Sequence, residues 1–321
     1  MSQHSAARRW ARRALVAGGA ATAARFAYYL WERSRAGDPW DPEAPGYPDG
    51  DQRTVTTPDG ATLEMTIAGP GDGPVVVLSH CWTGSRAVWG PVAERLVADG
   101  CRVVLYDQRG HGGSTDGDRP HSIPMLGDDL RAVLTEVDAR DAVLVGHSMG
   151  GMSVQSFLTE HPVEFKERVR GVVLVATAAK VLGRAIPPSL ATRLMGEGAL
   201  EWSRRGSVGY VMARRSLGRG ARRADVELTL DGLARTNGIA RAGFLAAMAG
   251  MDLHAGLQAI DVPTTVLVGN RDRLTPPRLA RELVSSIPGA RLVVLPGAGH
   301  MLPLEAPDEI VDAIRAVSAP A

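Results

Sequence analysis

The chain has 321 residues, 45% of them hydrophobic, and its 36 basic and 35 acidic residues leave a formal net charge of +1. This composition excludes an intrinsically disordered chain, and the balanced charge argues against a protein that binds nucleic acid through a global basic field. Because there are only two cysteines, Cys81 and Cys101, a disulfide scaffold and a cysteine-rich metal site are also excluded, and we expect no metal and no cofactor.

The first segment, residues 1–35, combines a basic start with a short apolar run. Four arginines precede the apolar residues 14–24, and aromatic residues follow Arg25 as far as Trp31. A membrane-attached helix, a cleaved secretory signal and an alanine-rich helix of a soluble domain all fit this pattern. We favour association with a membrane surface through residues 8–31 over a cytoplasmic or exported location, although Arg25 interrupts a strict transmembrane span.

The next segment, residues 36–52, is expected to be a linker, because its four prolines cannot continue a helix. The folded body should begin near Arg53. Residues 53–57 and 62–67, joined by a Pro-Asp-Gly turn, predict an antiparallel hairpin at the edge of a sheet.

After the hairpin, short and wholly apolar runs alternate with segments of helical periodicity. Runs without polar alternation predict strands buried on both faces, as in parallel sheets covered by helices. The pattern therefore predicts an α/β doubly wound, mostly parallel sheet. The predicted strands are residues 75–78, 103–105, 142–145, 172–175, 266–268 and 292–295.

Residues 182–257 interrupt this rhythm and contain no buried-strand pattern. They are predicted to form a helical cap inserted into the core, which then comprises residues 53–181 and 258–321. The insertion holds eleven arginines against six acidic residues. An ordinary solvated surface explains this excess, and a basic face that meets anionic lipids or acidic substrates is the alternative.

The strongest local signal is Gly146-His147-Ser148-Met149-Gly150, which lies between a predicted strand and a predicted helix. Such a tight turn is typical of a nucleophile elbow, in which the serine has a strained backbone and an exposed hydroxyl. Small residues are needed two positions before and after the serine, and Gly146 and Gly150 meet that need. Ser148 is therefore the candidate nucleophile.

A serine hydroxyl needs a base to accept its proton, and the base needs a carboxylate to orient it. His300 follows the last predicted strand and Asp272 follows the strand before it. Both loops leave the edge of the sheet at which α/β proteins place their sites. Ser148, Asp272 and His300 are thus the predicted catalytic residues.

The negative oxygen that forms during attack needs donors placed in advance. The backbone N–H of Met149 is one candidate, because it lies at the start of the helix that follows Ser148. The backbone N–H of Trp82, in the loop after residues 75–78, is the other.

These motifs together resemble the α/β-hydrolase superfamily over about residues 53–317. The segments that carry the resemblance are His80-Cys81-Trp82-Thr83-Gly84, Asp107-Gln108-Arg109-Gly110-His111-Gly112-Gly113-Ser114, Gly146-His147-Ser148-Met149-Gly150-Gly151, Asn270-Arg271-Asp272 and Gly297-Ala298-Gly299-His300. The resemblance is greatest to the serine esterase and lipase branch, including monoacylglycerol-lipase-like enzymes and perhydrolases. One departure is Cys81, which stands where that family usually has glycine.

The resemblance implies a serine hydrolase that cleaves carboxylic esters, of lipophilic character, through an acyl-enzyme. A small-molecule ester is the expected partner, and no nucleic acid is. Thioesterase, perhydrolase or lysophospholipase chemistry on the same triad is the alternative, and a non-catalytic ligand-binding protein of the same fold is a further one.

Overall fold

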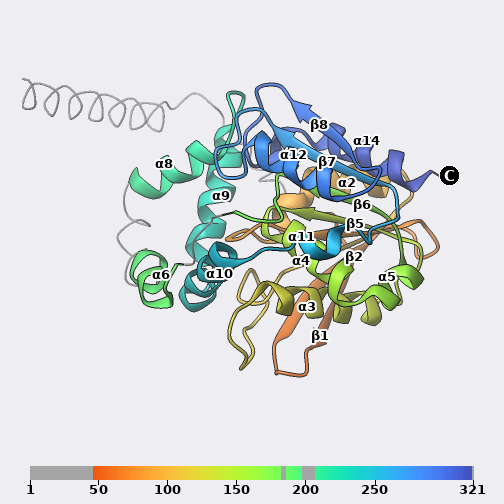
Figure 1. The fold of residues 1–321 in the computed structure, drawn as a ribbon, viewed down its shortest axis with the longest axis horizontal. Coiled ribbons are helices and arrows are strands. Elements are labelled where there is room, and N and C mark those ends of the chain that lie inside the picture. The colour runs from red at the N-terminus through yellow and green to blue at the C-terminus, as the bar shows by residue number, and fades with distance from the viewer. Residues whose placement is uncertain (1–45, 182–185, 197–206, 320–321) are drawn as a thin grey trace, which may run out of the picture.

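The computed structural model describes residues 46–181, 186–196 and 207–319 (Figure 1). The expected membrane-associating segment, residues 8–31, and most of the expected linker lie outside these ranges. Within the described chain, no helix combines the length and the apolar composition that crossing a bilayer requires.

The described strands form one eight-stranded sheet in the order β1-β2-β4-β3-β5-β6-β7-β8. The β1/β2 and β2/β4 pairs are antiparallel and the other pairs are parallel. This confirms the predicted doubly wound, mostly parallel sheet with a hairpin at its edge, although β1 begins two residues before Arg53. The strands are β1 (Asp51–Thr56), β2 (Thr62–Ala68), β3 (Val75–Ser79), β4 (Arg102–Tyr106), β5 (Ala142–His147), β6 (Val169–Val175), β7 (Thr264–Gly269) and β8 (Arg291–Leu295).

Helices cover both faces of this sheet (Figure 1). The helices of the core are η1 (Arg86–Trp89), α2 (Gly90–Ala98), α3 (Ile123–Glu136), α4 (Met149–Glu160), α5 (Pro162–Arg168), α12 (Pro277–Ser286), α13 (Leu302–Glu305) and α14 (Pro307–Ser318). Those between β6 and β7 are α6 (Pro188–Met195), α8 (Ser207–Ser216), α9 (Arg223–Arg235), α10 (Gly238–Gly250) and α11 (His254–Leu257).

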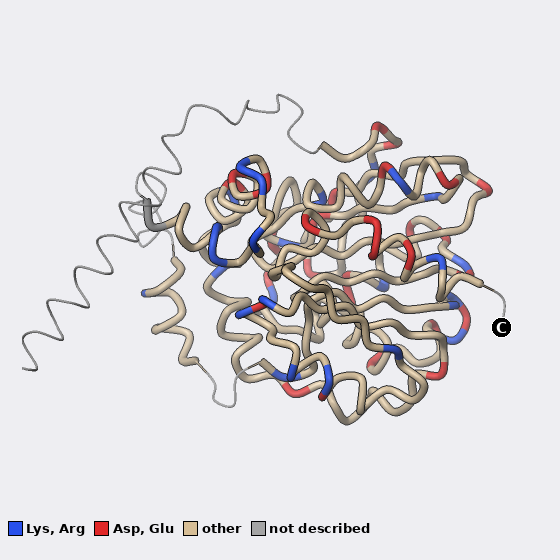
Figure 2. The backbone as a smooth tube through the Cα atoms, turned by 90° about the horizontal axis from the view of Figure 1, so that it is seen from above, with Lys and Arg blue, Asp and Glu red and all other residues tan. Residues whose placement is uncertain are grey.

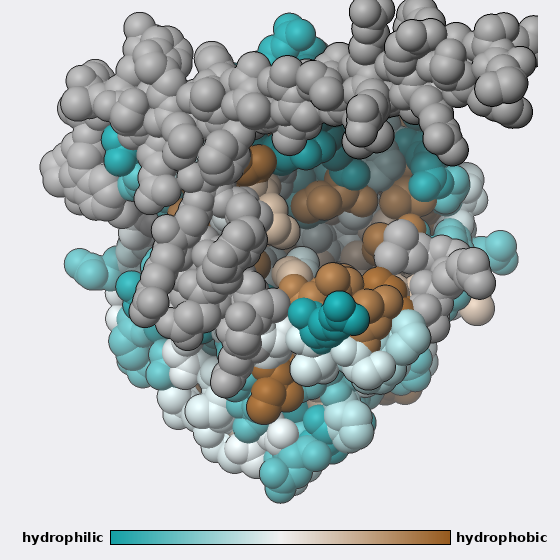
Figure 3. Space-filling view, turned by 90° about the vertical axis from the view of Figure 1, so that its left-hand side faces the viewer, coloured by the Kyte–Doolittle hydropathy of each residue, from teal (hydrophilic) through white to brown (hydrophobic). Residues whose placement is uncertain are grey.

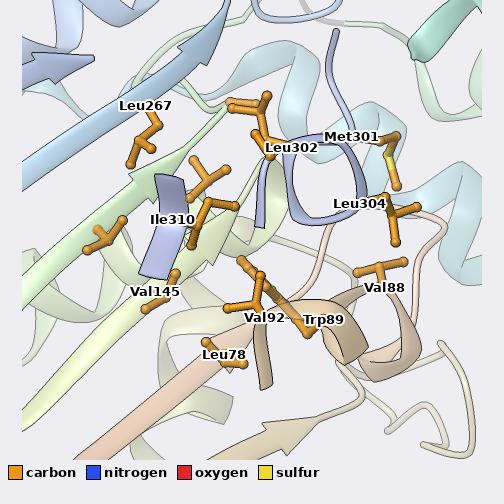
Figure 4. Close-up of a cluster of buried hydrophobic side chains, with 14 of the residues drawn as sticks. Leu78, Val88, Trp89, Val92, Val145, Leu267, Met301, Leu302, Leu304 and Ile310 are labelled. Carbon is orange, nitrogen blue, oxygen red and sulfur yellow. The ribbon is translucent and has the colours of Figure 1, made fainter. Parts of the chain in front are cut away.

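Alternation along each strand divides the core into two layers, because successive side chains point to opposite faces of a sheet. Val76 and Leu78 of β3 pack in the layer under α2 and α14, whereas Val77 packs in the layer under α3, α4 and α12. Figure 4 shows the first layer, where Val92 of α2 and Ile310 of α14 lie among the side chains of the strands. Full burial of each such side chain stabilises the folded state by roughly 1.5–3 kcal/mol.

The last strand differs from its prediction. The apolar run at residues 292–295 predicts burial on both faces, but β8 is exposed at Arg291 and 39% exposed at Val294. It forms the edge of the sheet and pairs with β7 alone. An edge strand lacks a neighbour on one side, so an apolar run there does not guarantee burial.

The residues between β6 and β7 fold as helices, and no strand occurs in their described part. Helices α6, α8, α9 and α10 gather at one end of the molecule (Figure 1). Helix α11 does not join this group: it contacts α4 and α12, and its Leu257 is buried in the core layer under these two helices.

Candidate active site

Ser148 lies at the sharp turn between β5 and α4, with φ 53° and ψ −114°. A positive φ is costly for a residue with a side chain, so the surrounding contacts must enforce it. The glycines leave the necessary room: a Cβ on Gly150 would collide with the carbonyl of Ser79, and one on Gly146 with the carbonyl of Gly150. The strained conformation predicted for Ser148 is confirmed.

Strand β6 and the residues that directly follow it hold the backbone of Ser148 on both sides of the residue. Its N–H donates to the carbonyl of Val175 at 2.9 Å, and its carbonyl accepts from Thr177 Oγ1 at 2.7 Å. The side chain is 8% exposed, and its hydroxyl has no hydrogen-bond partner within the described part of the chain. The hydroxyl is therefore free to meet a ligand.

Asp272 lies in the loop after β7, where three groups besides His300 stabilise its carboxylate. The N–H groups of Leu274 and Thr275 donate to Oδ1 at 2.8 and 2.9 Å, and Thr275 Oγ1 donates to Oδ2 at 2.8 Å. Burial raises the pKa of Asp272, but the charge of His300 and the hydrogen bonds from His300 and Thr275 outweigh it and hold the pKa below its ordinary value.

His300 lies in the loop after β8 and is 4% exposed. Its Nδ1 is 2.8 Å from Asp272 Oδ2, so the two predicted residues are in direct contact. A carboxylate can only accept, so this bond assigns the proton to Nδ1 and leaves Nε2 able to take a proton from another group.

The elbow and the loop of His300 touch through His147. Its Nε2 is 2.8 Å from the carbonyl oxygen of His300, and the two imidazole rings are 5.1 Å apart. Burial and the neighbouring His300 lower the pKa of His147 to about 3, so it stays neutral. The structure thus brings Ser148 and His300 into one region, and the described residues include no direct hydrogen bond between them.

The segments that carry the two candidate oxyanion donors pack together, because the start of α4 meets Ser79 and His80 at Gly150 and Trp82 packs against the cluster that contains Met149. In the described chain, the backbone N–H groups of Trp82 and Met149 have no hydrogen-bond acceptor. Both N–H groups are therefore available to a ligand.

His80 orients the peptide that carries the Trp82 N–H. The N–H of Gln108 donates to His80 Nε2 at 2.9 Å, so Nδ1 carries the proton and donates to the carbonyl of Cys81 at 2.7 Å. The N–H of Gly84 donates to that carbonyl as well, at 3.0 Å. In a planar trans peptide the N–H points opposite to the C=O, so these bonds direct the N–H of Trp82 away from His80.

The cysteine at the usual glycine position causes no backbone strain. Cys81 is absent from the non-glycine residues with positive φ, whereas Thr83 has φ 58°. Burial raises the pKa of the Cys81 thiol to about 12, which keeps it protonated and unreactive.

Four residues that the sequence did not single out support this site: Thr177, Thr275, His80 and Glu305. Glu305 accepts from the N–H groups on both sides of His300. Among these residues, only Thr275 had a local signal in the sequence. It lies three residues after Asp272, a spacing that is typical of a carboxylate that accepts hydrogen bonds from the following turn. Thr177 and His80 act across long separations in sequence, and Glu305, although close to His300 in the chain, gave no local signal that was recognised.

Comparison with known proteins gives a family and several relatives. The model of the "Alpha/beta hydrolase family" matches residues 75–313. The chain is similar to a bifunctional esterase/perhydrolase of Acinetobacter calcoaceticus, with 27% identity over 78% of this chain and 93% of that protein. It is also similar to a 3-oxoadipate enol-lactonase of Acinetobacter baylyi, with 30% identity over 82% of this chain and 95% of that protein.

A solved structure agrees with these relatives. A hydrolase from Pseudomonas aeruginosa superposes with a TM-score of 0.71 at 27% identity, covering 84% of this chain and 99% of that one. Sequence and fold therefore point to the same family.

Proposed function

The chain belongs to the alpha/beta hydrolase family and is of the esterase type, and from this premise we propose that it is a serine hydrolase that cleaves carboxylic esters through an acyl-enzyme. The observation that carries the proposal is the 2.8 Å bond between His300 Nδ1 and Asp272 Oδ2, in a loop that is bonded to the Ser148 elbow through His147.

In the proposed mechanism, Ser148 Oγ attacks the ester carbonyl while His300 Nε2 takes the hydroxyl proton. Asp272 keeps the other imidazole proton on Nδ1 and stabilises the positive charge that forms. His300 then protonates the leaving alcohol, and the acyl group stays on Ser148. A water molecule, activated by the same histidine, releases the acid. The Ser148–His300 hydrogen bond forms as substrate enters the site, because catalytic hydrogen bonds often reach their full geometry only in the substrate complex.

The N–H groups of Trp82 and Met149 stabilise the oxyanion. Neither N–H group has a hydrogen-bond acceptor in the described chain, which supports this role. The two hydrogen bonds to the Cys81 carbonyl support it further, because they hold the Trp82 peptide in one orientation. A donor that is already oriented needs no reorganisation when the negative charge develops.

Apolar residues next to the nucleophile support a lipophilic acyl group. Met149 belongs to a buried cluster rich in methionine, against which Trp82 packs. Methionine side chains adapt to ligands of different shape. The members of the cluster are Ile123, Met125, Leu126, Met149, Met152, Ala240, Phe244, Met248 and Met251.

The helices between β6 and β7 add apolar surface outside this cluster. Leu190, Leu194, Met212 and Ile239 are all more than 40% exposed, and Figure 3 shows apolar side chains around a hollow on the side formed by these helices. We propose that α6, α8, α9 and α10 form the cap of the site and present this surface to the substrate.

Three arginines of the insertion are paired with acidic residues and do not favour an anionic substrate. Arg222, Arg223 and Arg235 each pair with an acidic residue of α9, and acidic and basic residues lie close together there (Figure 2). Paired charges produce little net field. An uncharged ester fits this surface better than an acidic one.

Perhydrolysis is the second candidate, because the relative from Acinetobacter calcoaceticus is named an esterase/perhydrolase. The same acyl-enzyme would transfer its acyl group to hydrogen peroxide instead of water. Thioester and lysophospholipid cleavage would also use this triad and differ only in the pocket.

The test is hydrolysis of p-nitrophenyl esters of increasing acyl length by the wild type and by Ser148→Ala. We expect the variant to lose about 10⁴-fold or more in turnover and to lose labelling by a fluorophosphonate probe. Ser285→Ala, on the exposed face of α12, is the control.

A wild-type protein that neither hydrolyses these esters nor labels at Ser148 would contradict the proposal and favour the non-catalytic alternative. Peracid formation from the same esters with hydrogen peroxide distinguishes perhydrolysis from simple hydrolysis.

A further inference from the structure

The side chain of Glu305 occupies an unusual position, because in the described chain its carboxylate accepts three hydrogen bonds, all from backbone N–H groups. Oε2 accepts from Gly218 at 2.6 Å and from Gly299 at 2.9 Å. Oε1 accepts from Met301 at 3.0 Å. Gly299 and Met301 flank His300, so one carboxylate holds the main chain on both sides of the proposed base.

Gly218 comes from a different part of the chain, the segment between α8 and α9. Further bonds join this segment to the loop of His300: the His300 N–H donates to the carbonyl of Ser216 at 2.7 Å, and the Arg219 N–H donates to that of Gly297 at 3.2 Å. The segment at residues 216–219 therefore lies along the loop at residues 297–301, and Glu305 joins the two.

The fit between the two segments leaves no room for a side chain. A Cβ on Gly218 would collide with the carbonyl of Gly297, and would lie 2.6 Å from Glu305 Oε2. A Cβ on Gly299 would collide with the N–H of Gly218. Such contacts allow one arrangement of the backbone, because neither segment can shift without losing hydrogen bonds.

Glu305 itself is anchored from the other side. It ends helix α13, whose residues Leu302 and Leu304 are buried in the core, with Leu304 near Val88 (Figure 4). The carboxylate is thus fixed to the packed core and extends to the loop of His300.

We propose that Glu305 is a positioning residue for His300, and that it makes the helical insertion part of the support of the base. This inference rests on the proposed function, since it assigns His300 the role of base. The insertion then has two roles: it covers the site, and its segment at residues 216–219 fixes the orientation of the imidazole.

The negative charge of Glu305 gives a second effect, which separates this role from simple support. Carboxylates near an imidazole favour its protonated form. The groups that face His300 are Asp272 in the loop after β7, His147 at the end of β5, and Glu305. The nearest cation shown in the insertion is Arg214, whose Nη1 donates to the carbonyl of Gly218 at 2.9 Å. Removing the charge of Glu305 should therefore move the acidic limb of the pH–rate profile to lower pH.

The experiment measures kcat and KM for a p-nitrophenyl ester across pH for the wild type, Glu305→Gln and Gly218→Ala. In Glu305→Gln the amide nitrogen cannot accept a hydrogen bond, so at least one of the three N–H donors loses its partner. We expect kcat to fall about tenfold to a hundredfold with little change in KM, and the acidic limb of the profile to move down by several tenths of a pH unit.

Gly218→Ala disturbs the same junction and keeps the charge. It should lower kcat without moving the acidic limb. Glu309→Gln, an exposed carboxylate on α14, is the matched control and should behave as the wild type.

The inference is overturned if Glu305→Gln keeps the wild-type kcat and profile. It is also overturned if kcat falls while the acidic limb stays in place, because the carboxylate would then stabilise the loop without acting on His300. Should Glu305→Gln fail to fold, Gly218→Ala with an unchanged kcat would overturn it. Because the wild type is assayed and labelled with a fluorophosphonate in parallel, failure of the proposed function would be seen separately as an inactive, unlabelled wild type.

Discussion

The two sides of the candidate active site are built in different ways. The nucleophile side, at the junction of β5 and α4, has its shape from a tight turn: Gly146 and Gly150 allow it, and the neighbouring strand β6 holds Ser148. The base side has its shape from contacts between separate segments, since Asp272 and Ser216 hold His300 from distant parts of the chain and Glu305 holds it from the helix that directly follows.

This difference predicts how substitutions on each side affect stability and activity. A substitution in the elbow disturbs the packing of the sheet, so stability and activity should fall together. Substitutions around His300 remove hydrogen bonds at the surface end of two loops, so activity should fall while the core remains folded.

The largest effect is expected for Asp272→Asn. Leu274 and Thr275 donate to Oδ1, so the asparagine oxygen stays there and its NH₂ group faces His300 Nδ1. That arrangement favours the other tautomer, with the proton on Nε2, which can no longer accept the proton of Ser148. We expect kcat/KM for an ester to fall about 10⁴-fold.

Thermal unfolding checks whether the fold survives this change. An unfolding midpoint within a few degrees of the wild type would agree with the contrast between the two sides. Loss of the folded state would show that Asp272 is as integral to the core as the elbow is.

Gly150→Ala tests the nucleophile side and should have the next largest effect. The new methyl group collides with the carbonyl of Ser79, and overpacking of this kind costs about 1–3 kcal/mol. The displaced Ser148 should lose about 10²-fold in turnover, since a shift of about 1 Å is enough for such a loss. Gly71→Ala, where a Cβ meets nothing within 4 Å, is the control.

Turnover and the unfolding midpoint should be measured on the same preparation of Gly150→Ala. If turnover fell while the midpoint stayed at the wild-type value, stability and activity would not be coupled at the elbow.

Acid should act on stability through three buried histidines. Burial lowers the pKa of His80 to about 4 and that of both His111 and His147 to about 3, against about 6.5 in the unfolded chain. Between these values the unfolded chain binds more protons, so the stability present above about pH 6.5 is lost as the pH falls through the folded values. Each histidine contributes up to about 1.4 kcal/mol per pH unit.

Chemical denaturation at pH 7, 6 and 5 measures this slope. His147→Gln keeps an N–H donor for the His300 carbonyl and removes one titrating group, so its slope should be smaller. A free energy of unfolding that is constant between pH 7 and pH 5 would contradict the expectation.

The sequence predicted much of the fold and the elbow because these depend on local patterns. Apolar runs identified the parallel strands, and the glycines around Ser148 identified the turn. The prediction that β8 is buried on both faces was wrong, because an apolar run does not reveal which strand lies at the edge of the sheet. The role of residues 8–31 stays a prediction.

What the sequence determined by itself was therefore the order of the strands and helices along the chain and the identity of the candidate nucleophile, since backbone propensity and side-chain alternation act over a few residues. Only the tertiary structure decided that Glu305 accepts hydrogen bonds on both sides of His300, that His80 fixes the peptide of Trp82, and that residues 216–219 lie along the loop of the base. Glu305 lies close to His300 in the chain, but nothing in its local pattern indicates that its carboxylate turns back to accept from this loop. The contacts of His80 and of residues 216–219 join segments far apart in the chain, and their hydrogen bonds exist only once the sheet has brought the loops to a common edge.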